Sequence, residues 1–289
     1  MRHLSFLCCL SICLLHSCSY RFQRLARLPY VLEEASGLYI ENAETFWLHN
    51  DSGGRATLYA VDPSGTLKDS LAIPGAANQD WEDLSHDDRG NLYLFDSGNN
   101  LNQRQNLRVY KWNRAEKKLS TIAYAYPDQA AFPPASQAQW GFDAEGAFWF
   151  GDSLCLFSKD YLPNARYQTR LYALPDHGGQ YTAVLKDSLT LNQRVVTAAA
   201  ISPNGSQVAL LSYLFRRRKV IPKARGSVFL LENFPERDFL KGSIRQLDIP
   251  RIGLGRQFEA IDFLDSRTLI IAAERTKIHR QRLFRLKIK

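Results

Sequence analysis

Three glutamates at comparable places in the chain are the strongest candidates for chemistry. Glu82 stands in Asp-Trp-Glu-Asp, Glu145 in Asp-Ala-Glu-Gly, and Glu259 in Phe-Glu-Ala-Ile. Carboxylates that share a partly desolvated site repel one another, so they require a cation, an arginine or shared protons. Carboxylate oxygens suit Ca²⁺ or Mg²⁺. Glu82, Glu145 and Glu259 are therefore candidate metal ligands. The alternative is that they bond backbone N–H groups and hold neighbouring elements together.

A degenerate five-fold repeat would bring these glutamates together. Each copy has a short strand opened by an acidic or small residue, a polar turn, and an apolar strand ending in polar residues. The five copies span 36–51, 82–97, 145–159, 199–213 and 259–274. In the first and fourth copies, Ser36 and Ala199 take the place of the glutamate.

Further strands follow most copies, which predicts small antiparallel sheets of four strands. The fourth strand of the third copy is predicted at 181–185. The fifth copy lacks one because the chain ends, and 20–29 would supply it by pairing with the carboxy-terminal strand, which leaves no open sheet edge. The prediction is an all-β, five-bladed β-propeller formed by 18–289 as a single domain. Six blades are the alternative.

The composition agrees with a compact β protein. Of the 289 residues, 45% are hydrophobic and 23% charged, which provides a core and excludes a disordered chain. Aromatic residues make up 12%, and ring side chains favour the pleated surface of strands. Collagen, coiled coils and multi-pass membrane proteins are excluded.

In a propeller, the starts of the innermost strands and the ends of the second strands share one rim of the central channel. Polar residues recur at both places, so this rim is the predicted ligand-binding site. Each residue alone is an ordinary loop residue, and the recurrence is the signal. Besides the three glutamates, the predicted set is His49, Asn50, Asp51, Asp83, Asp96, Asn100, Arg104, Lys159, Tyr213, Arg216, Glu274 and Arg275.

The net charge of +8 is unevenly distributed. Six bases lie in 216–225 and seven in 275–289, and neither window contains an acid. Setting aside these thirteen and Arg2 leaves 23 bases against 29 acids. The two basic windows fall partly on the predicted rim, which favours an anionic small molecule or polymer, or a protein, as partner. Nucleic acid is disfavoured because exposed aromatics for base stacking are not interleaved with the bases.

The first 17 residues predict a secretory signal peptide. Arg2 and His3 precede an apolar run at 4–15 that is too short to span a membrane. Leu-His-Ser-Cys, ending at Cys18, is similar to a relaxed bacterial lipobox, which predicts lipidation of Cys18. We therefore expect an exported lipoprotein anchored in the cell envelope, with ordinary signal cleavage as the alternative. Cys155 lies in an apolar run and is expected in the core.

Familiar catalytic motifs are missing from the sequence, including Gly-x-Ser-x-Gly, His-Glu-x-x-His and the phosphate-binding Gly-x-x-x-x-Gly-Lys. The favoured interpretation is a non-enzymatic propeller that binds an anionic ligand or partner at its rim. One alternative is a Ca²⁺- or Mg²⁺-dependent hydrolase of phosphate esters or lactones that uses the three glutamates. The other is a protein-interaction scaffold.

Five short motifs resemble a known family. They are His-Asn-Asp-Ser-Gly-Gly at 49–54, Asp-Trp-Glu-Asp-Leu at 80–84, Asp-Ser-Gly-Asn-Asn at 96–100, Thr-Ala-Ala-Ala-Ile-Ser-Pro-Asn-Gly at 197–205 and Phe-Glu-Ala-Ile at 258–261. The chain is similar to secreted bacterial propeller proteins, often lipoproteins, related to the phytase-esterase-like and SdiA-regulated groups. The resemblance implies the fold and export. Members usually carry an aspartate where this chain has Ala200, so one rim carboxylate is missing.

Overall fold

The computed structural model describes residues 20–160, 167–191, 193–214, 225–250 and 256–289. The predicted signal segment, Cys18 and Arg216 lie outside the described residues. Three single-turn 3-10 helices occur within them: η1 (Tyr30–Leu32), η2 (Gln137–Gln139) and η3 (Phe239–Lys241). None of the helices in this described part is long and apolar enough to cross a membrane.

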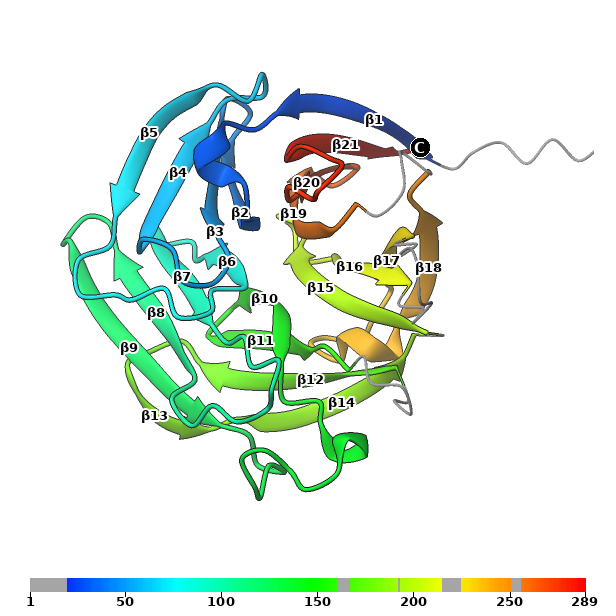
Figure 1. Ribbon diagram of the computed structural model, residues 1–289. Helices are drawn as coiled ribbons and strands as arrows, with labels where there is room; N and C mark the ends of the chain where they lie inside the picture. The colour runs from blue at the N-terminus through cyan, green and yellow to red at the C-terminus, as the bar shows by residue number, and fades with distance from the viewer. Residues whose placement is uncertain (1–19, 161–166, 192, 215–224, 251–255) are drawn as a thin grey trace, which may run out of the picture.

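Five antiparallel sheets surround a central axis, as Figure 1 shows. Blade one contains β2 (Ala35–Asn42), β3 (Thr45–Asn50), β4 (Thr57–Val61) and β5 (Leu67–Ala72). Blade two contains β6 (Asp83–His86), β7 (Asn91–Asp96), β8 (Arg108–Asn113) and β9 (Lys118–Ala125). Blade three contains β10 (Ala144–Phe150), β11 (Ser153–Ser158), β12 (Gln168–Pro175) and β14 (Val184–Thr190). Blade four contains β15 (Arg194–Ile201), β16 (Gln207–Leu214), β17 (Gly226–Glu232) and β18 (Ser243–Asp248).

The two ends of the chain close the ring in blade five. This blade contains β19 (Phe258–Asp265), β20 (Thr268–Ala273), β21 (Arg282–Ile288) and, outermost, β1 (Tyr20–Arg27). Strand β1 pairs antiparallel with β21, with Tyr20 opposite Ile288. Phe22 of β1 stacks on Phe284 of β21, with ring centroids 5.3 Å apart, so closure also buries aromatic surface. The five-bladed prediction is confirmed, together with its terminal closure, and the six-bladed alternative is wrong.

The fourth strand of blade three was predicted at 181–185, and the structure corrects this position. Strand β14 begins at Val184, while the preceding β13 (Gly179–Thr182) pairs in parallel with β9 of blade two. The outer edge of blade two is therefore covered by a segment of its neighbour, which protects that edge from pairing with another chain. The sequence pattern alone did not separate these two short strands because only Ala183 lies between them.

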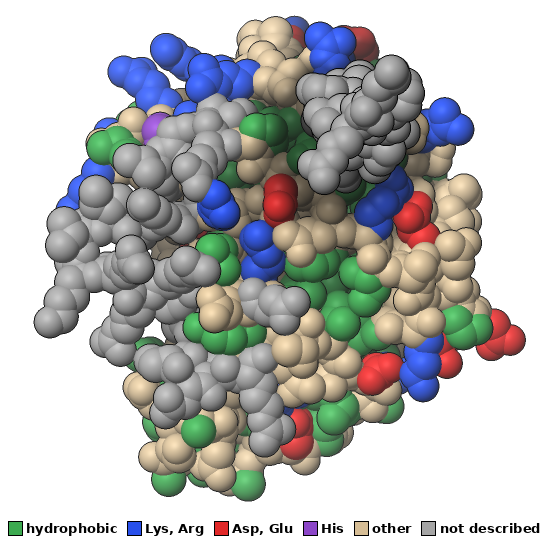
Figure 2. All heavy atoms as spheres, turned by 90° about the vertical axis from the view of Figure 1, so that its right-hand side faces the viewer, with side chains coloured by type: hydrophobic (Ala, Val, Ile, Leu, Met, Phe, Trp, Pro, Cys, Tyr) green, Lys and Arg blue, Asp and Glu red, His purple; other side chains and the backbone are tan. Residues whose placement is uncertain are grey.

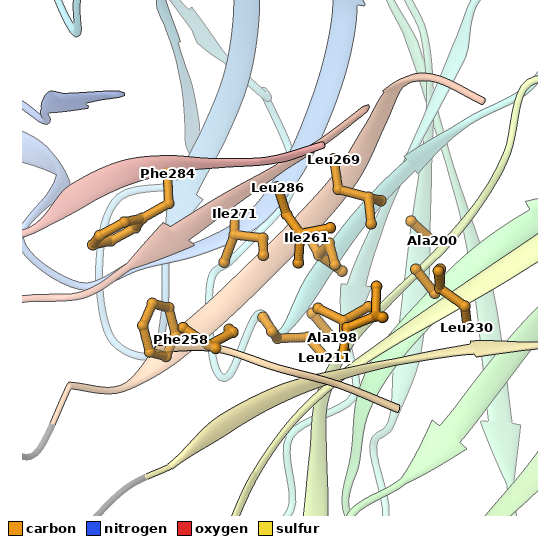
Figure 3. Packing of buried hydrophobic residues seen from close by; sticks show 14 of the residues in the cluster. Ala198, Ala200, Leu211, Leu230, Phe258, Ile261, Leu269, Ile271, Phe284 and Leu286 are labelled. Carbon is orange, nitrogen blue, oxygen red and sulfur yellow. The ribbon is translucent and has the colours of Figure 1, made fainter. Parts of the chain in front are cut away.

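Apolar side chains fill the spaces between neighbouring blades. Figure 3 shows the cluster between blades four and five, where Ala198 of β15 faces Ile261 of β19. The inner strands contact one another in the order β2, β6, β10, β15, β19 and back to β2. Strands β10 and β15 are buried on both faces, and most of their residues are apolar rather than alternating with polar ones. Cys155 is buried in the cluster between blades three and four, as predicted.

Short polar side chains link successive blades around the channel. Ser36 donates to the carbonyl of Glu82 at 2.6 Å, Ser97 to that of Ala144 at 2.8 Å, and Thr197 to that of Phe258 at 2.7 Å. All three hydroxyls are buried, so each satisfies a carbonyl that water cannot reach.

Two aspartates, of which Asp83 is buried and Asp262 is partly buried, also join neighbouring blades. The Oδ2 atom of Asp83 accepts the backbone N–H groups of Ala147 at 2.8 Å and Ala199 at 3.1 Å, which joins the inner strands of blades two, three and four. Asp262 of blade five accepts the N–H of Ile40 in blade one at 2.7 Å. Asp83 was predicted as a ligand-binding residue, and the structure places its carboxylate against backbone donors.

Removal of the Asp83 carboxylate is expected to destabilise the ring. Asp83→Ala leaves the N–H groups of Ala147, Ala199 and Leu84 without this acceptor, at about 1–3 kcal/mol each, so the free energy of unfolding falls by at least about 3 kcal/mol. Urea denaturation of the variant measures this loss. Asp88→Ala, at an exposed turn residue of the same blade, is the control and should change the free energy by less than about 0.5 kcal/mol. Equal effects of both substitutions would contradict the locking role.

Candidate functional site

A β-bulge turns one residue of the inner strand towards the channel in several blades. The β10–β11 register shifts between Ala144 and Gly146, which leaves Glu145 as the extra residue. The β19–β20 register shifts between Phe258 and Ala260, which leaves Glu259. Bulges re-aim side chains and are common beside functional sites. Glu82 occupies the corresponding place in blade two, immediately before the first paired residue of β6.

In blades one and four, the strand register shows that the residue at the glutamate position differs from the one that the sequence repeat indicated. The shift in blade one falls between Ser36 and Leu38, and the shift in blade four between Val196 and Ala198. Gly37 and Thr197 therefore correspond to the glutamates, rather than Ser36 and Ala199. The sequence comparison missed this because a bulge inserts one residue into the alternation of the strand.

Carboxylates from different blades meet at this end of the channel. Oxygens of Asp51, Asp80 and Glu82 lie within 4.8 Å of one another, and so do oxygens of Glu82, Asp143 and Glu145. Glu82 belongs to both groups. Glu259 and Glu274 interact electrostatically with this set. We call these residues the acidic mouth: Asp51, Asp80, Glu82, Asp143, Glu145, Glu259 and Glu274.

The carboxylates at the centre of the acidic mouth are buried, and hydrogen bonds satisfy only some of their oxygens. Glu82 is 5% exposed and Glu145 is 3% exposed. Within the described residues, no donor bonds the side chain of Glu82. Asp143 accepts the N–H of Asn99 at 2.6 Å through Oδ1. Its buried Oδ2 has no N–H or hydroxyl donor in the described structure, and a hydrogen bond between its carboxyl and that of Glu145 requires one of the two to be protonated. Burial and then the neighbouring acids raise the pKa of Glu82 well above its ordinary value.

Lys159 is the one amine close to these acids in the described chain. Its Nζ donates to Glu145 and lies 6.0 Å from the ring centre of Tyr213. Burial alone would lower the pKa of Lys159, but Glu145 and the other acids outweigh it and hold the pKa well above the ordinary value. The amine is therefore a fixed positive charge, and it balances only part of the negative charge of the acidic mouth.

Three acids of the mouth titrate near neutral pH. Burial, followed by the charge of Asp51, raises the pKa of Asp80 to about 7. Burial raises the pKa of Glu259 to about 7 against the opposing effect of Lys159. Burial and then Glu259 raise the pKa of Glu274 to about 8. Groups of this kind can exchange protons at physiological pH.

The loop after β7 supports the mouth from one side. Arg104 donates to Asp96 at 3.0 Å and to the carbonyl of Gly98 at 2.6 Å, so it shapes the loop and is already engaged. Gly98 is required here because a Cβ atom would overlap the carboxylates of Glu82 and Asp80. Asn100, in the same loop, is exposed.

Other predicted residues lie behind or beside the acidic mouth. His49 is fully buried, its ring edge faces Trp81 at 5.5 Å, and burial lowers its pKa to about 4, so it is neutral. Asn50 donates to the carbonyl of Val31 at 2.7 Å. Arg275 pairs with Glu33 at 2.7 Å on the outer part of blade five. The structure brings together Asp51, Glu82, Glu145, Lys159, Tyr213, Glu259 and Glu274.

Asp80 and Asp143 are the two members of the mouth that the sequence interpretation did not single out. Each stands two residues before a predicted glutamate, in Asp80-Trp81-Glu82 and in Asp143-Ala144-Glu145. Side chains at positions i and i+2 of extended chain point to the same side, so this shared spacing was the available signal.

The chemistry of these donors fits a hard divalent cation. All the candidate ligand atoms are carboxylate oxygens, which Ca²⁺ and Mg²⁺ prefer, and no thiol or imidazole takes part in the two groups. A cation would also supply the missing partner of Asp143 Oδ2 and reduce the repulsion around Glu82.

The chain is similar to several solved protein structures, but its sequence identity to them is low. No protein-family model and no curated protein match the chain. A gluconolactonase from Xanthomonas campestris is 12% identical over 93% of this chain and 90% of that chain, with a TM-score of 0.47. A second solved protein, named only as a provisional gluconolactonase, is 13% identical over 94% and 93%, with a TM-score of 0.45. Hydrazine synthase from Kuenenia stuttgartiensis is 12% identical over 87% of this chain, with a TM-score of 0.43, and the chain spans 58% of its length.

The metal-free protein should lose stability as the pH rises from about 7 to about 9. The pKa of Glu274 is raised from 4.5 to about 8 and that of Asp80 from 3.8 to about 7, so the folded state binds more protons than the unfolded state as the pH passes through these values. At lower pH the opposite effect of His49 intervenes, because its pKa is lowered to about 4 in the folded state and the unfolded chain then binds the extra proton. Thermal melting in EDTA between about pH 7 and about pH 9 measures the loss. A flat or rising Tm in this range would show that these carboxyls are not desolvated.

Proposed function

We propose that the acidic mouth binds a divalent cation, Ca²⁺ or Mg²⁺, and that the bound ion recruits an anionic or oxygen-rich ligand to the rim. The main evidence is that two groups of three carboxylates overlap and share Glu82. In addition, Asp143 Oδ2 is buried and has no N–H or hydroxyl donor among the described residues. Asp51, Asp80, Glu82, Asp143 and Glu145 would hold the ion.

The alternative role, in which the glutamates lock the blades, is less well supported. Asp83 and Asp262 bond backbone N–H groups of neighbouring blades, and Ser36, Ser97 and Thr197 bond carbonyls. Glu145 instead accepts from Lys159. The blades are therefore already joined by other residues, and the glutamates remain available for a ligand.

A bound cation would allow an anionic ligand to bind at an acidic rim. Without it, the carboxylates repel any anion that approaches the channel. With it, the positive charge of the ion adds to that of Lys159, and the ligand can supply oxygens to the remaining coordination positions, because Ca²⁺ takes six to eight oxygen ligands. The phenol of Tyr213, beside Lys159, is a further donor at this place.

Hydrolysis of a phosphate ester or a lactone is a second candidate function. It is favoured by the raised pKa values of two glutamates beside the proposed ion site. Glu259 and Glu274, with pKa values of about 7 and 8, could give or take a proton near neutral pH. A bound divalent ion would polarise the carbonyl or phosphoryl oxygen and lower the pKa of water. If neither ion nor substrate binds, a protein-interaction scaffold is the function that remains.

The proposal includes the place where the protein acts. The segment 1–17 reads as a signal peptide, and lipidation of Cys18 would attach the chain to the cell envelope. The motif resemblance to secreted propellers, related to the phytase-esterase-like and SdiA-regulated groups, supports the same location.

The cation site is tested by substitution of the shared ligand. Residues 19–289 contain every strand that the structure describes. We expect Ca²⁺ or Mg²⁺ to raise the Tm of this form, with an increase that grows with the logarithm of ion concentration above the Kd. Glu82→Gln should abolish this increase without lowering the Tm in EDTA, because it removes a buried charge and no hydrogen bond. Differential scanning fluorimetry and isothermal titration calorimetry measure the two effects.

Two further variants make this test specific. Gly98→Ala should fold but weaken ion binding at least about tenfold, because the added methyl displaces the carboxylates of Glu82 and Asp80. Glu116→Gln, at an exposed turn residue of blade two, is the matched control and should keep the full response. An ion response that survives Glu82→Gln would refute the site, and a fall in the EDTA Tm of that variant would favour the locking role.

If the protein is a hydrolase, its turnover should require both the bound ion and a proton donor, Glu259 or Glu274. A panel of phosphate esters and lactones, assayed with Ca²⁺ or Mg²⁺, should reveal a substrate whose kcat/KM falls at least about a hundredfold in Glu259→Gln or Glu274→Gln. Ion binding by these variants, measured in parallel, should persist. If no substrate in the panel is turned over by the ion-loaded protein, the hydrolase candidate fails and the binding function stands.

A further inference from the structure

The outer edge of blade five carries a row of exposed bases. Arg21, Arg24 and Arg27 lie along β1, the outermost strand, and Lys277 and Arg280 lie in the loop between β20 and β21. We call these five residues the basic edge. Figure 2 shows Lys and Arg side chains gathered along the upper part of the face that includes this side of the ring.

The protein supplies no acid to neutralise the basic edge. Within the described residues, none of these five side chains forms an ion pair or a side-chain hydrogen bond. All 29 aspartates and glutamates of the chain are among the described residues, so the remaining segments can add none. Behind the edge, burial and then the charges of Arg24 and Arg27 lower the pKa of Arg282. The positive charge is therefore available to an external anion.

Two apolar side chains project from the same corner. Tyr30 and Ile278 are each 68% exposed, which is unusual for side chains of this size. They line a hollow of about 520 Å³ together with Arg27, Lys277 and Arg280.

The loop that bears Ile278 is fixed rather than loose. Thr276 accepts the N–H of His279 at 3.1 Å through Oγ1 and donates its own N–H to the carbonyl of that residue at 2.8 Å. Gln281 donates to the carbonyl of Pro29 at 2.9 Å, and Arg275 donates its N–H to the carbonyl of Glu33 at 2.7 Å. These bonds hold the loop against the segment after β1, so Ile278 is presented on a rigid turn.

We propose that the basic edge, with Tyr30 and Ile278, docks on an anionic lipid bilayer. Exposed apolar tips flanked by bases combine shallow insertion with attraction to acidic headgroups, which is how peripheral proteins bind membranes. The location in the chain favours this partner, since Tyr20 opens β1 two residues after Cys18 and five after the apolar run 4–15. The hollow has the size and charge for a lipid phosphate. Binding at this surface does not depend on the proposed cation site.

The test uses residues 19–289 and vesicles of phosphatidylcholine, alone or mixed with phosphatidylglycerol. We expect co-sedimentation with the mixed vesicles only, decreasing as salt is added. The double variant Lys277→Gln and Arg280→Gln should weaken binding about thirtyfold, from about 1 kcal/mol per base. Ile278→Ser should weaken it about tenfold through the lost apolar contact.

The control pair Lys118→Gln and Lys186→Gln removes the same charge from the outer strands of blades two and three and should bind like the parent. Equal binding to neutral and mixed vesicles, or an equal loss in the control pair, would overturn the proposal. So would displacement by inorganic phosphate with no effect of Ile278→Ser, because that result would identify a small-anion pocket. Circular dichroism of each variant confirms that the ring is folded.

Discussion

Several carboxylates of this propeller lie out of water in one small volume, the acidic mouth. The free-energy cost of burying them together is the constraint on which the candidate site depends. Ring closure brings the bulge residues of different blades to a common axis, and Glu82, Glu145 and Glu259 are drawn together whether or not they are neutralised. Lys159 supplies one compensating charge. The remainder must be met by protons or by a cation, and the two compete because a metal binds the ionised form.

Stability and function use different polar side chains that lie side by side. Asp83 is the neighbour of Glu82 in sequence, yet its carboxylate accepts hydrogen bonds from three backbone N–H groups, whereas that of Glu82 accepts none in the described chain. The alternation of the strand explains this division, because consecutive side chains point to opposite sides. Hydroxyls of Ser36, Ser97 and Thr197 add the blade-to-blade bonds. The ring can therefore tolerate an unfavourable charge arrangement at its mouth, since its integrity does not depend on those carboxylates.

The sequence was sufficient for the fold and for most of the candidate site, and its failures have physical causes. Repeats of strand, turn and strand predicted five blades, and the unpaired amino-terminal strand predicted closure. The pattern could not place Gly37 and Thr197 at the glutamate positions, because a bulge is a property of the hydrogen-bond register and not of residue type. Asp80 and Asp143 were passed over because loop aspartates are common as turn residues. Only the coordinates bring them within reach of Glu82.

The two charged surfaces of the molecule are set apart by the width of blade five. The three arginines of the basic edge lie on β1, the outermost strand, whereas Glu259 of the acidic mouth lies on β19, the innermost. At physiological ionic strength the screening length is about 8 Å, less than the roughly 14 Å across four strands at 4.8 Å spacing. Lys277 and Arg280 lie nearer to the mouth, in the loop that follows Glu274, but they form no ion pair with it in the described structure. A small cation therefore fits the buried carboxylates of the mouth, whereas an extended anionic surface fits the exposed arginines of β1.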